Sequence, residues 1–181
     1  SAEDELRKVL EKVREDIDRL ADENRKVLKR SKDETKRLIK ENREVLERVE
    51  EIIRRDNVDR KDLEEARRVL EEARRSLEEL VERSKRLNDR LEETLRELIK
   101  EAKRVLEEAE REVREVATRG ESEEAIERII RRIREILERL RKKSEEHIRR
   151  VEDVARRNEE ESREHIKTVE KILEELKRKA D

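Results

Sequence analysis

The sequence contains no Cys, Pro, Met, Phe, Tyr or Trp, and it has one Gly in 181 residues. Without Cys there are no disulfides, no zinc fingers and no thiol chemistry. One Gly cannot form a phosphate-binding loop or a dinucleotide fingerprint. No apolar run approaches the roughly 18 residues of a membrane-spanning helix, and no apolar segment near the N-terminus is typical of a secretory signal. We therefore expect no membrane association and no targeting signal.

Charged residues make up 59% of the chain and hydrophobic residues 31%, but the net charge is only −2. High charge with few apolar residues could indicate disorder. Against disorder, the charges are finely mixed, and the apolar residues are periodic in a composition typical of long helices. A nucleic-acid partner would require a basic stripe and aromatic stacking side chains, and the chain has neither. The sequence thus predicts an all-α protein with no nucleic-acid partner.

The helical pattern is broken at only two places. At the first, Asn57 tolerates the left-handed conformation that ends a helix, and Asp59 is a good N-cap for the next. At the second, Gly120 ends a helix and Ser122 caps the one that follows. Ser1 caps the first helix. These signals predict two short loops between three helices.

The predicted helices cover about residues 2–55, 60–118 and 123–180. Short loops make neighbouring helices antiparallel. The predicted fold is therefore a long antiparallel up-down-up three-helix bundle, forming a single domain over residues 1–181.

The apolar positions recur every eighteen residues. Examples are Val9, Val27 and Val45 in the first helix, and Ile130, Ile148 and Ile166 in the third. Eighteen residues make five turns of an unstrained helix, whereas a seven-residue repeat forces a left-handed supercoil. We therefore expect the bundle to be nearly untwisted.

Polar residues on the apolar arcs follow the same repeat. Folding the chain at its two loops places them at three matched heights. The first level contains Asn24, Thr94, Ser144 and His147; the second contains Asn42, Ser76, Ser162 and His165; between them lie Ser31, Thr35, Ser84, Asn88 and Asn158. A buried polar group without a partner costs roughly 1–3 kcal/mol. The matched levels therefore predict three cross-helix hydrogen-bond networks.

Each of these residue types also has a simpler interpretation. A Ser or Thr on a helix commonly bonds to the carbonyl four residues earlier, and an Asn on an apolar arc commonly fixes helix register. His147 and His165 are about 27 Å apart by helical rise, so they cannot share a metal. No Cys is present, and the levels contain no carboxylates. We expect structural histidines, no catalytic residue, no metal and no cofactor. Burial should favour the neutral ring, so that stability declines below about pH 6.5.

The combined pattern resembles a family of de novo designed helical bundles, built on parametric backbones with buried hydrogen-bond networks. The resemblance covers the whole chain. It rests on the eighteen-residue register, the idealised caps, a core of Val, Leu, Ile and Ala, and polar residues at matched heights. It implies very high stability, no catalytic residues, and recombinant cytoplasmic expression as a soluble protein. Natural long coiled coils differ, because they usually keep heptads and carry Gln, Met and aromatic residues.

Two functional hypotheses remain open at this point. The first is a self-contained designed scaffold with no natural biochemical activity, which requires no partner. The alternative is an interaction module, in which a groove accepts a fourth helix or a second copy of the chain. The second helix has the widest apolar arc, which favours the alternative slightly. An enzyme or a metal protein finds almost no support among the residues. The mass in solution, compared with the chain mass of 22.1 kDa, separates the two main hypotheses.

Overall fold

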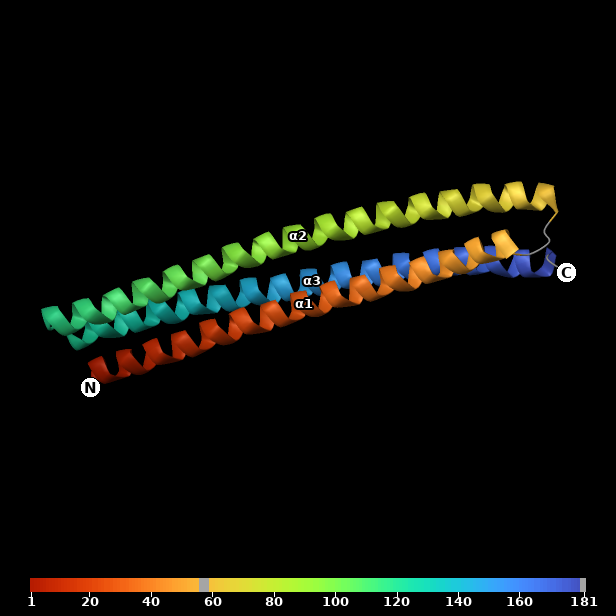
Figure 1. The fold of residues 1–181 in the computed structure, drawn as a ribbon. Helices are drawn as coiled ribbons and strands as arrows, with labels where there is room; N and C mark the ends of the chain where they lie inside the picture. Colours follow the sequence, from red (N-terminus) through yellow and green to blue (C-terminus); the bar gives the residue numbers. More distant parts are fainter. Residues whose placement is uncertain (56–58, 180–181) are drawn as a thin grey trace. The chain divides into compact units, whose positions relative to one another are not determined.

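The computed structural model describes residues 1–55 and 59–179. Three long α-helices pack against each other: α1 at Ala2–Arg55, α2 at Arg60–Arg119 and α3 at Glu123–Lys179 (Figure 1). No β-strand occurs in these ranges. The predicted all-α three-helix bundle is confirmed, and every helix end lies within one residue of its predicted position.

The helix ends show the capping interactions that the sequence predicts. Ser1 Oγ accepts the Asp4 backbone N–H at 3.4 Å and donates to the Asp4 carboxylate at 3.0 Å. Gly120 has a φ of 62°, the left-handed conformation that an L side chain rarely adopts. Ser122 Oγ accepts the backbone N–H of Ala125 at 3.2 Å. These contacts satisfy backbone groups that a helix end would otherwise leave unpaired.

The start of α2 is described from Asp59 onward. The Asp59 carbonyl accepts the backbone N–H of Leu63 at 2.8 Å. Asp59 is therefore the N-cap of α2, as predicted. The predicted helix-ending residue Asn57 lies outside the described residues.

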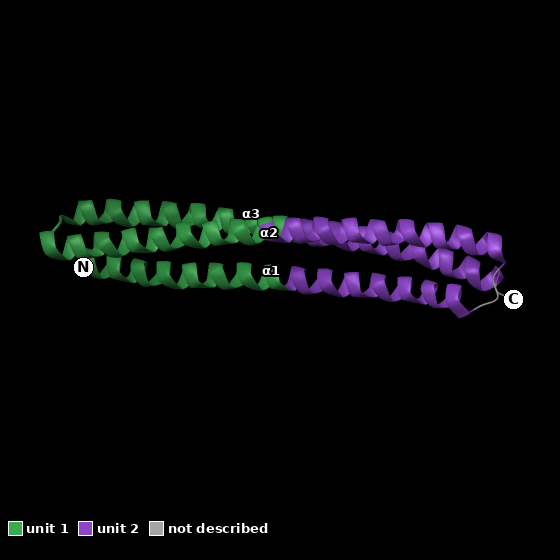
Figure 2. Ribbon diagram, turned by 45° about the horizontal axis from the view of Figure 1, so that its top comes forward, with its two compact units in different colours: residues 1–29, 90–151 green, residues 30–89, 152–181 purple. Residues whose placement is uncertain are grey.

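The chain divides into two compact units, and each helix contributes one segment to each unit (Figure 2). Unit 1 contains residues 1–29 and 90–151, and unit 2 contains residues 30–89 and 152–181. The single domain predicted from the sequence, and its lack of twist, stay predictions.

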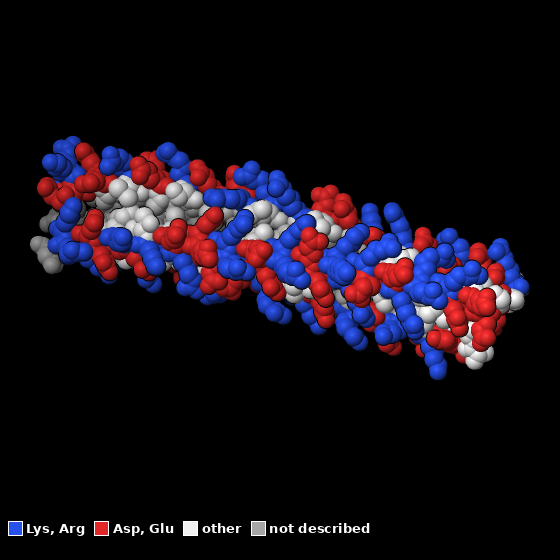
Figure 3. All heavy atoms as spheres, turned by 180° about the vertical axis from the view of Figure 1, so that it is seen from behind, with Lys and Arg blue, Asp and Glu red and all other residues white. Residues whose placement is uncertain are grey.

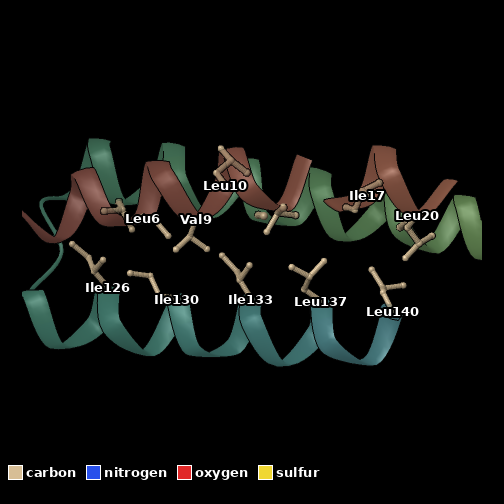
Figure 4. Packing of buried hydrophobic residues seen from close by; sticks show 14 of the residues in the cluster. Leu6, Val9, Leu10, Ile17, Leu20, Ile126, Ile130, Ile133, Leu137 and Leu140 are labelled. Carbon is tan, nitrogen blue, oxygen red and sulfur yellow. The ribbon is translucent and has the colours of Figure 1, made fainter. Parts of the chain in front are cut away.

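In unit 1, buried residues follow helical spacing on all three segments. Figure 4 shows side chains of α1 and α3 facing one another across this core. The α1 residues in it are Leu6, Val9, Leu10, Val13, Ile17 and Leu20, and the α3 residues are Ile126, Ile130, Ile133, Leu137 and Leu140. Burying one such side chain contributes about 1.5–3 kcal/mol, so this stripe rather than intrinsic propensity holds the segments together.

Surface ion pairs show the direction of each segment in unit 1. Arg141 on α3 contacts Asp16 on α1 at 2.7 Å, and Lys143 contacts Glu101 on α2 at 2.8 Å. Farther back along α3, Arg132 contacts Glu112. Numbers therefore rise on α2 as they fall on α3, which makes these two segments antiparallel.

Unit 2 has a second apolar core. Its buried residues are Val45, Leu46 and Val49 on α1, Ala66, Leu70, Ala73, Leu77 and Leu80 on α2, and Val169, Leu173 and Leu176 on α3. The contacts of Lys179 with Asp62 and of Asn158 with Ser84 show that α2 and α3 are antiparallel here too. The buried polar side chains lie along the same helical stripes as the two cores.

Candidate functional site

The unit 1 histidine site links side chains and backbone of all three helices. His147 on α3 is 3% exposed, and Asn24 on α1 is fully buried. The ring Nδ1 lies 2.9 Å from Asn24 Oδ1, and Nε2 lies 3.0 Å from the backbone oxygen of Leu91 on α2. Asn24 Nδ2 donates to the Leu20 carbonyl at 2.8 Å and contacts Ser144 Oγ at 2.6 Å. Every polar atom of the two central side chains thus has a partner.

The unit 2 histidine site repeats this arrangement. His165 Nδ1 lies 2.6 Å from Asn42 Oδ1, and Nε2 lies 2.7 Å from the backbone oxygen of Ala73. Asn42 Nδ2 donates to the Leu38 carbonyl at 2.8 Å. Asn42 is fully buried, whereas His165 is half-buried.

The eighteen-residue repeat explains why the two sites share one geometry. On α1 and α3 the second site lies eighteen residues after the first, so the same helix faces are used again. On α2, which runs antiparallel, the carbonyl lies eighteen residues earlier. A helical carbonyl already accepts the N–H four residues later, but its oxygen has a second lone pair that can contact the ring.

The structure brings three of the four predicted first-level residues together, but it leaves Thr94 outside. Thr94 is exposed, and its hydroxyl donates to the Arg90 carbonyl at 3.0 Å, the local bond common for Thr on a helix. At the second level Ser76 is exposed as well. Thr94 and Ser76 lie at the predicted levels along the helix axis, but at the edge of the apolar face of α2. At that edge a small rotation of the helix decides whether a side chain is buried or exposed.

Ser162 is buried at the second level, at 2% exposed. Its counterpart Ser144 contacts Asn24, but no hydrogen bond joins Ser162 to Asn42 among the described residues. The second network is therefore smaller than the first by one side chain.

The middle level in unit 2 is buried as expected, but it forms only one cross-helix pair. Ser84 Oγ donates to Asn158 Oδ1 at 3.2 Å, and Thr35 Oγ1 donates locally to the Ser31 carbonyl at 2.9 Å. Ser31 Oγ, Asn88 Oδ1 and Asn158 Nδ2 are buried with no hydrogen-bond partner in the part of the chain that the structure describes. Short Ser side chains cannot span the distance between two helices without a longer residue opposite them. The described residues therefore form two histidine sites and one Ser–Asn pair, in place of the three networks predicted.

Charged groups surround the unit 1 histidine site on its α2–α3 side. A surface cavity of about 240 Å³ is lined there by His147 and by charged residues of both helices. Lys143 Nζ lies 2.8 Å from Glu101, and Arg150 contacts Glu146 at 3.1 Å. Within the described ranges, no group of three or more His, Cys, Asp or Glu side chains could hold a metal ion.

Shifted pKa values occur at exposed groups. In unit 2, a hydrogen bond from Arg37 lowers the pKa of the Glu34 carboxyl, and the same bond raises the pKa of Arg37. In unit 1, the Ser1 hydroxyl and then the N-terminal ammonium lower the pKa of the Asp4 carboxyl. These shifts reflect local ion pairs and capping.

Comparison with known proteins finds no matching protein family, no similar curated sequence and no similar solved structure. Among the described residues, no helix is long and apolar enough to cross a bilayer. The lack of natural relatives is consistent with a designed protein.

Proposed function

We propose that this chain is a designed structural scaffold with no natural biochemical activity, whose packing is specified by buried polar contacts. The observation that carries the proposal is the histidine site that occurs twice, eighteen residues apart, with each Asn and His linked to another helix. The idealised caps and the lack of natural relatives support the same conclusion.

Buried polar contacts suit a specificity role better than a stabilising one. Replacing polar pairs with apolar residues of similar volume is often neutral or stabilising, whereas misaligned polar groups are penalised. In coiled coils a single buried Asn can fix register and oligomeric state. Asn24 and Asn42 hold this kind of position, because each contacts a histidine of another helix.

The surface fits a scaffold that stays separate from other molecules. Figure 3 shows one face on which basic and acidic side chains are interspersed, with other residues between them. No large hydrophobic side chain is exposed within residues 1–55 and 59–179. Mixed charge with no exposed large hydrophobic side chain among these residues favours solubility and disfavours unintended association.

The alternative, an interaction module, is favoured by one feature of unit 2. A surface cavity of about 520 Å³ lies between α1 and α2, with Leu46, Leu77 and Val81 in its lining. Acidic and basic residues, among them Glu50 and Arg74, form the rest of that lining. A helix with a short apolar stripe could occupy it, but its apolar part is small for a stable interface.

Size-exclusion chromatography with light scattering tests the proposal. We expect the parent to be one species near 22.1 kDa that keeps its helical circular dichroism above about 90 °C. The variant Asn24→Leu with Asn42→Leu should stay helical but broaden into several species. The matched control is Thr94→Val with Ser76→Ala, which removes two polar groups from exposed positions and should stay monodisperse. A parent that forms a defined dimer, or a double Asn variant as uniform as the parent, contradicts the proposal.

A further inference from the structure

Each histidine site is a series of three consecutive contacts that runs from a backbone carbonyl on one helix to a backbone carbonyl on another. In unit 1 the order is Leu91 oxygen, His147, Asn24, Leu20 oxygen. Both ends are carbonyl oxygens, which accept hydrogen bonds and never donate them. Each of the three contacts needs one hydrogen, and only the two side chains between the carbonyls can supply it.

With a neutral ring, one of these three contacts has no hydrogen. The Asn24 amide donates on one side and accepts on the other, and a neutral imidazole donates from only one nitrogen. With Asn24 Nδ2 on the Leu20 carbonyl at 2.8 Å, the ring faces acceptors at both Nδ1 and Nε2. Turning the amide over lets the Ser144 hydroxyl donate to the amide oxygen, but it moves the deficit to Leu20, where two oxygens would then meet. Two of three contacts are filled in either case.

A second proton on the ring fills all three contacts. We propose that the two histidine sites are proton-binding sites, in which His147 and His165 are held as imidazolium in the folded chain. The unit 2 site supports this independently, because it has the same order of atoms at 2.7, 2.6 and 2.8 Å. Such short contacts between two unprotonated acceptors would be repulsive, whereas a charged donor shortens a hydrogen bond. The proposal does not rest on the scaffold function.

Burial opposes the charge, and the surrounding groups decide how strongly. Around His147, α2 contributes the carboxylates of Glu97 and Glu101 to the shared cavity. From α3 come Glu146, Lys143 and Arg150, and all three are in ion pairs, Lys143 with Glu101 and Arg150 with Glu146. On α1, Asp16 is paired with Arg141, which lies six residues before His147 on α3. The three carboxylates around the cavity outnumber its two cations, which favours a positive ring.

Around His165 the charged groups are largely paired. On the α2–α3 side Arg83 contacts Glu161 at 3.2 Å, and on the α1–α2 side Arg74 contacts Glu50. On the α1–α3 side Glu34, Glu41 and Arg37 of α1 face the pair formed by Glu159 and Arg163 of α3. Because His165 is only half-buried, solvent reduces the cost of its charge.

The sign of the pH dependence follows. A ring that holds its proton more tightly when folded contributes stability below about pH 6.5, where an unfolded histidine is protonated. This contribution is lost as the pH rises and the folded ring releases its proton. The direction is opposite to the one expected when burial alone is considered, because burial alone ignores the two acceptors that face the ring.

Nitrogen-15 NMR of the ring nitrogens tests the proposal directly. In the parent at about pH 7.5, well above the value for an unfolded ring, both nitrogens of both rings should carry hydrogen. Asn24→Leu removes the acceptor at Nδ1 of His147, so one hydrogen on Nε2 then satisfies that ring. We expect His147 to become neutral in this variant while His165 stays protonated. Asn42→Leu should give the reciprocal result, so each variant carries its own internal control.

Either of two outcomes overturns the proposal. One is a parent in which both rings are neutral at about pH 7.5, with hydrogen on a single nitrogen. The other is a folded Asn24→Leu variant in which His147 stays as protonated as in the parent. Circular dichroism establishes whether each variant folds. If neither variant folds, the nitrogen-15 NMR spectrum of the parent alone tests the proposal.

Discussion

The two histidine sites share their contacts but differ in how well they are covered. His147 is 3% exposed and its Asn24 also contacts Ser144, whereas His165 is half-buried and Asn42 has no such serine contact. The ring nitrogens of His165 nevertheless lie closer to their acceptors, at 2.6 and 2.7 Å. The eighteen-residue repeat therefore sets the contacts of the ring nitrogens, whereas the neighbouring side chains set how far each ring is exposed.

Two positions of the repeat that lie next to the rings carry different residues in the two units. The α2 residue whose carbonyl meets the ring is Leu91 in unit 1 and Ala73 in unit 2. One turn after the ring on α3, Arg150 lines the cavity at His147, and the equivalent residue in unit 2 is the shorter Thr168. We expect the larger side chains at both positions to shield His147. The comparison predicts that substitutions can change the solvent exposure of a histidine ring without changing its hydrogen bonds.

The largest effect is expected for Leu91→Ala, which gives the first site the α2 residue of the second. Removing a buried Leu side chain should lower the free energy of unfolding by about 2–5 kcal/mol, measured by guanidinium denaturation. A soluble paramagnetic agent should then relax the His147 ring protons nearly as fast as those of His165. The matched control is Leu95→Ala, also buried on α2, which should lose similar stability without exposing the ring. Equal relaxation in both variants would contradict the assignment of cover to Leu91.

A smaller effect is expected at the serines. Ser144→Ala removes the contact with Asn24 and should cost about 1 kcal/mol of unfolding free energy. Ser162→Ala removes a buried hydroxyl that has no bond to Asn42, so it should cost clearly less. Denaturant titration of the two variants side by side measures the difference. If Ser162→Ala costs as much as Ser144→Ala, the two networks have the same members in solution.

Thr94→Val and Ser76→Ala should change the stability still less. Both side chains are exposed and outside the histidine sites, so each unfolding free energy should stay within about 0.5 kcal/mol of the parent. Guanidinium midpoints at constant pH measure this. A loss above 1 kcal/mol, a value typical of a buried hydrogen bond, would place these residues in the networks after all.

The smallest effect concerns Glu34, whose pKa is lowered by the hydrogen bond from Arg37. A carboxyl with a lowered pKa contributes stability above its unfolded value of about 4.3 and loses it as the pH falls through the folded value. Glu34→Gln should therefore reduce the loss of stability on acidification slightly, in denaturant titrations at several pH values below 5. High salt should abolish the difference, because the pair is solvent-exposed. A difference that persists in salt would indicate a buried contact.

The fold could be predicted from the sequence because its signals are local. Gly120 and Ser122 mark a helix end within a few residues, and the spacing of apolar residues defines each buried face. Matching heights across the loops also places Asn24, Ser144 and His147 at one level, and contacts join these three residues in the structure. These predictions depend only on helix geometry, which varies little from one protein to another.

The details of the sites could not be predicted in the same way. Thr94 and Ser76 lie at arc edges, and small rotations of α2 decide whether they are buried. The carbonyls of Leu91 and Ala73 carry no sequence signal, since every residue has one. The partners of each ring nitrogen depend on how the helices pack, which only the structure identifies.

Contact with a backbone carbonyl has a consequence for how α2 is aligned. A helix offers an equivalent carbonyl on the same face about every 5.4 Å, so the ring of His147 can detect the rotation of α2 but not which turn lies opposite. A shift of α2 by one turn would present another carbonyl to the ring. Within unit 2, the longitudinal position of α2 therefore depends on side-chain identity, as in the pair of Ser84 with Asn158. The histidine contacts therefore constrain the rotation of α2, whereas side-chain pairs such as Asn24 with His147 and Ser84 with Asn158 fix the longitudinal positions of the helices that they join.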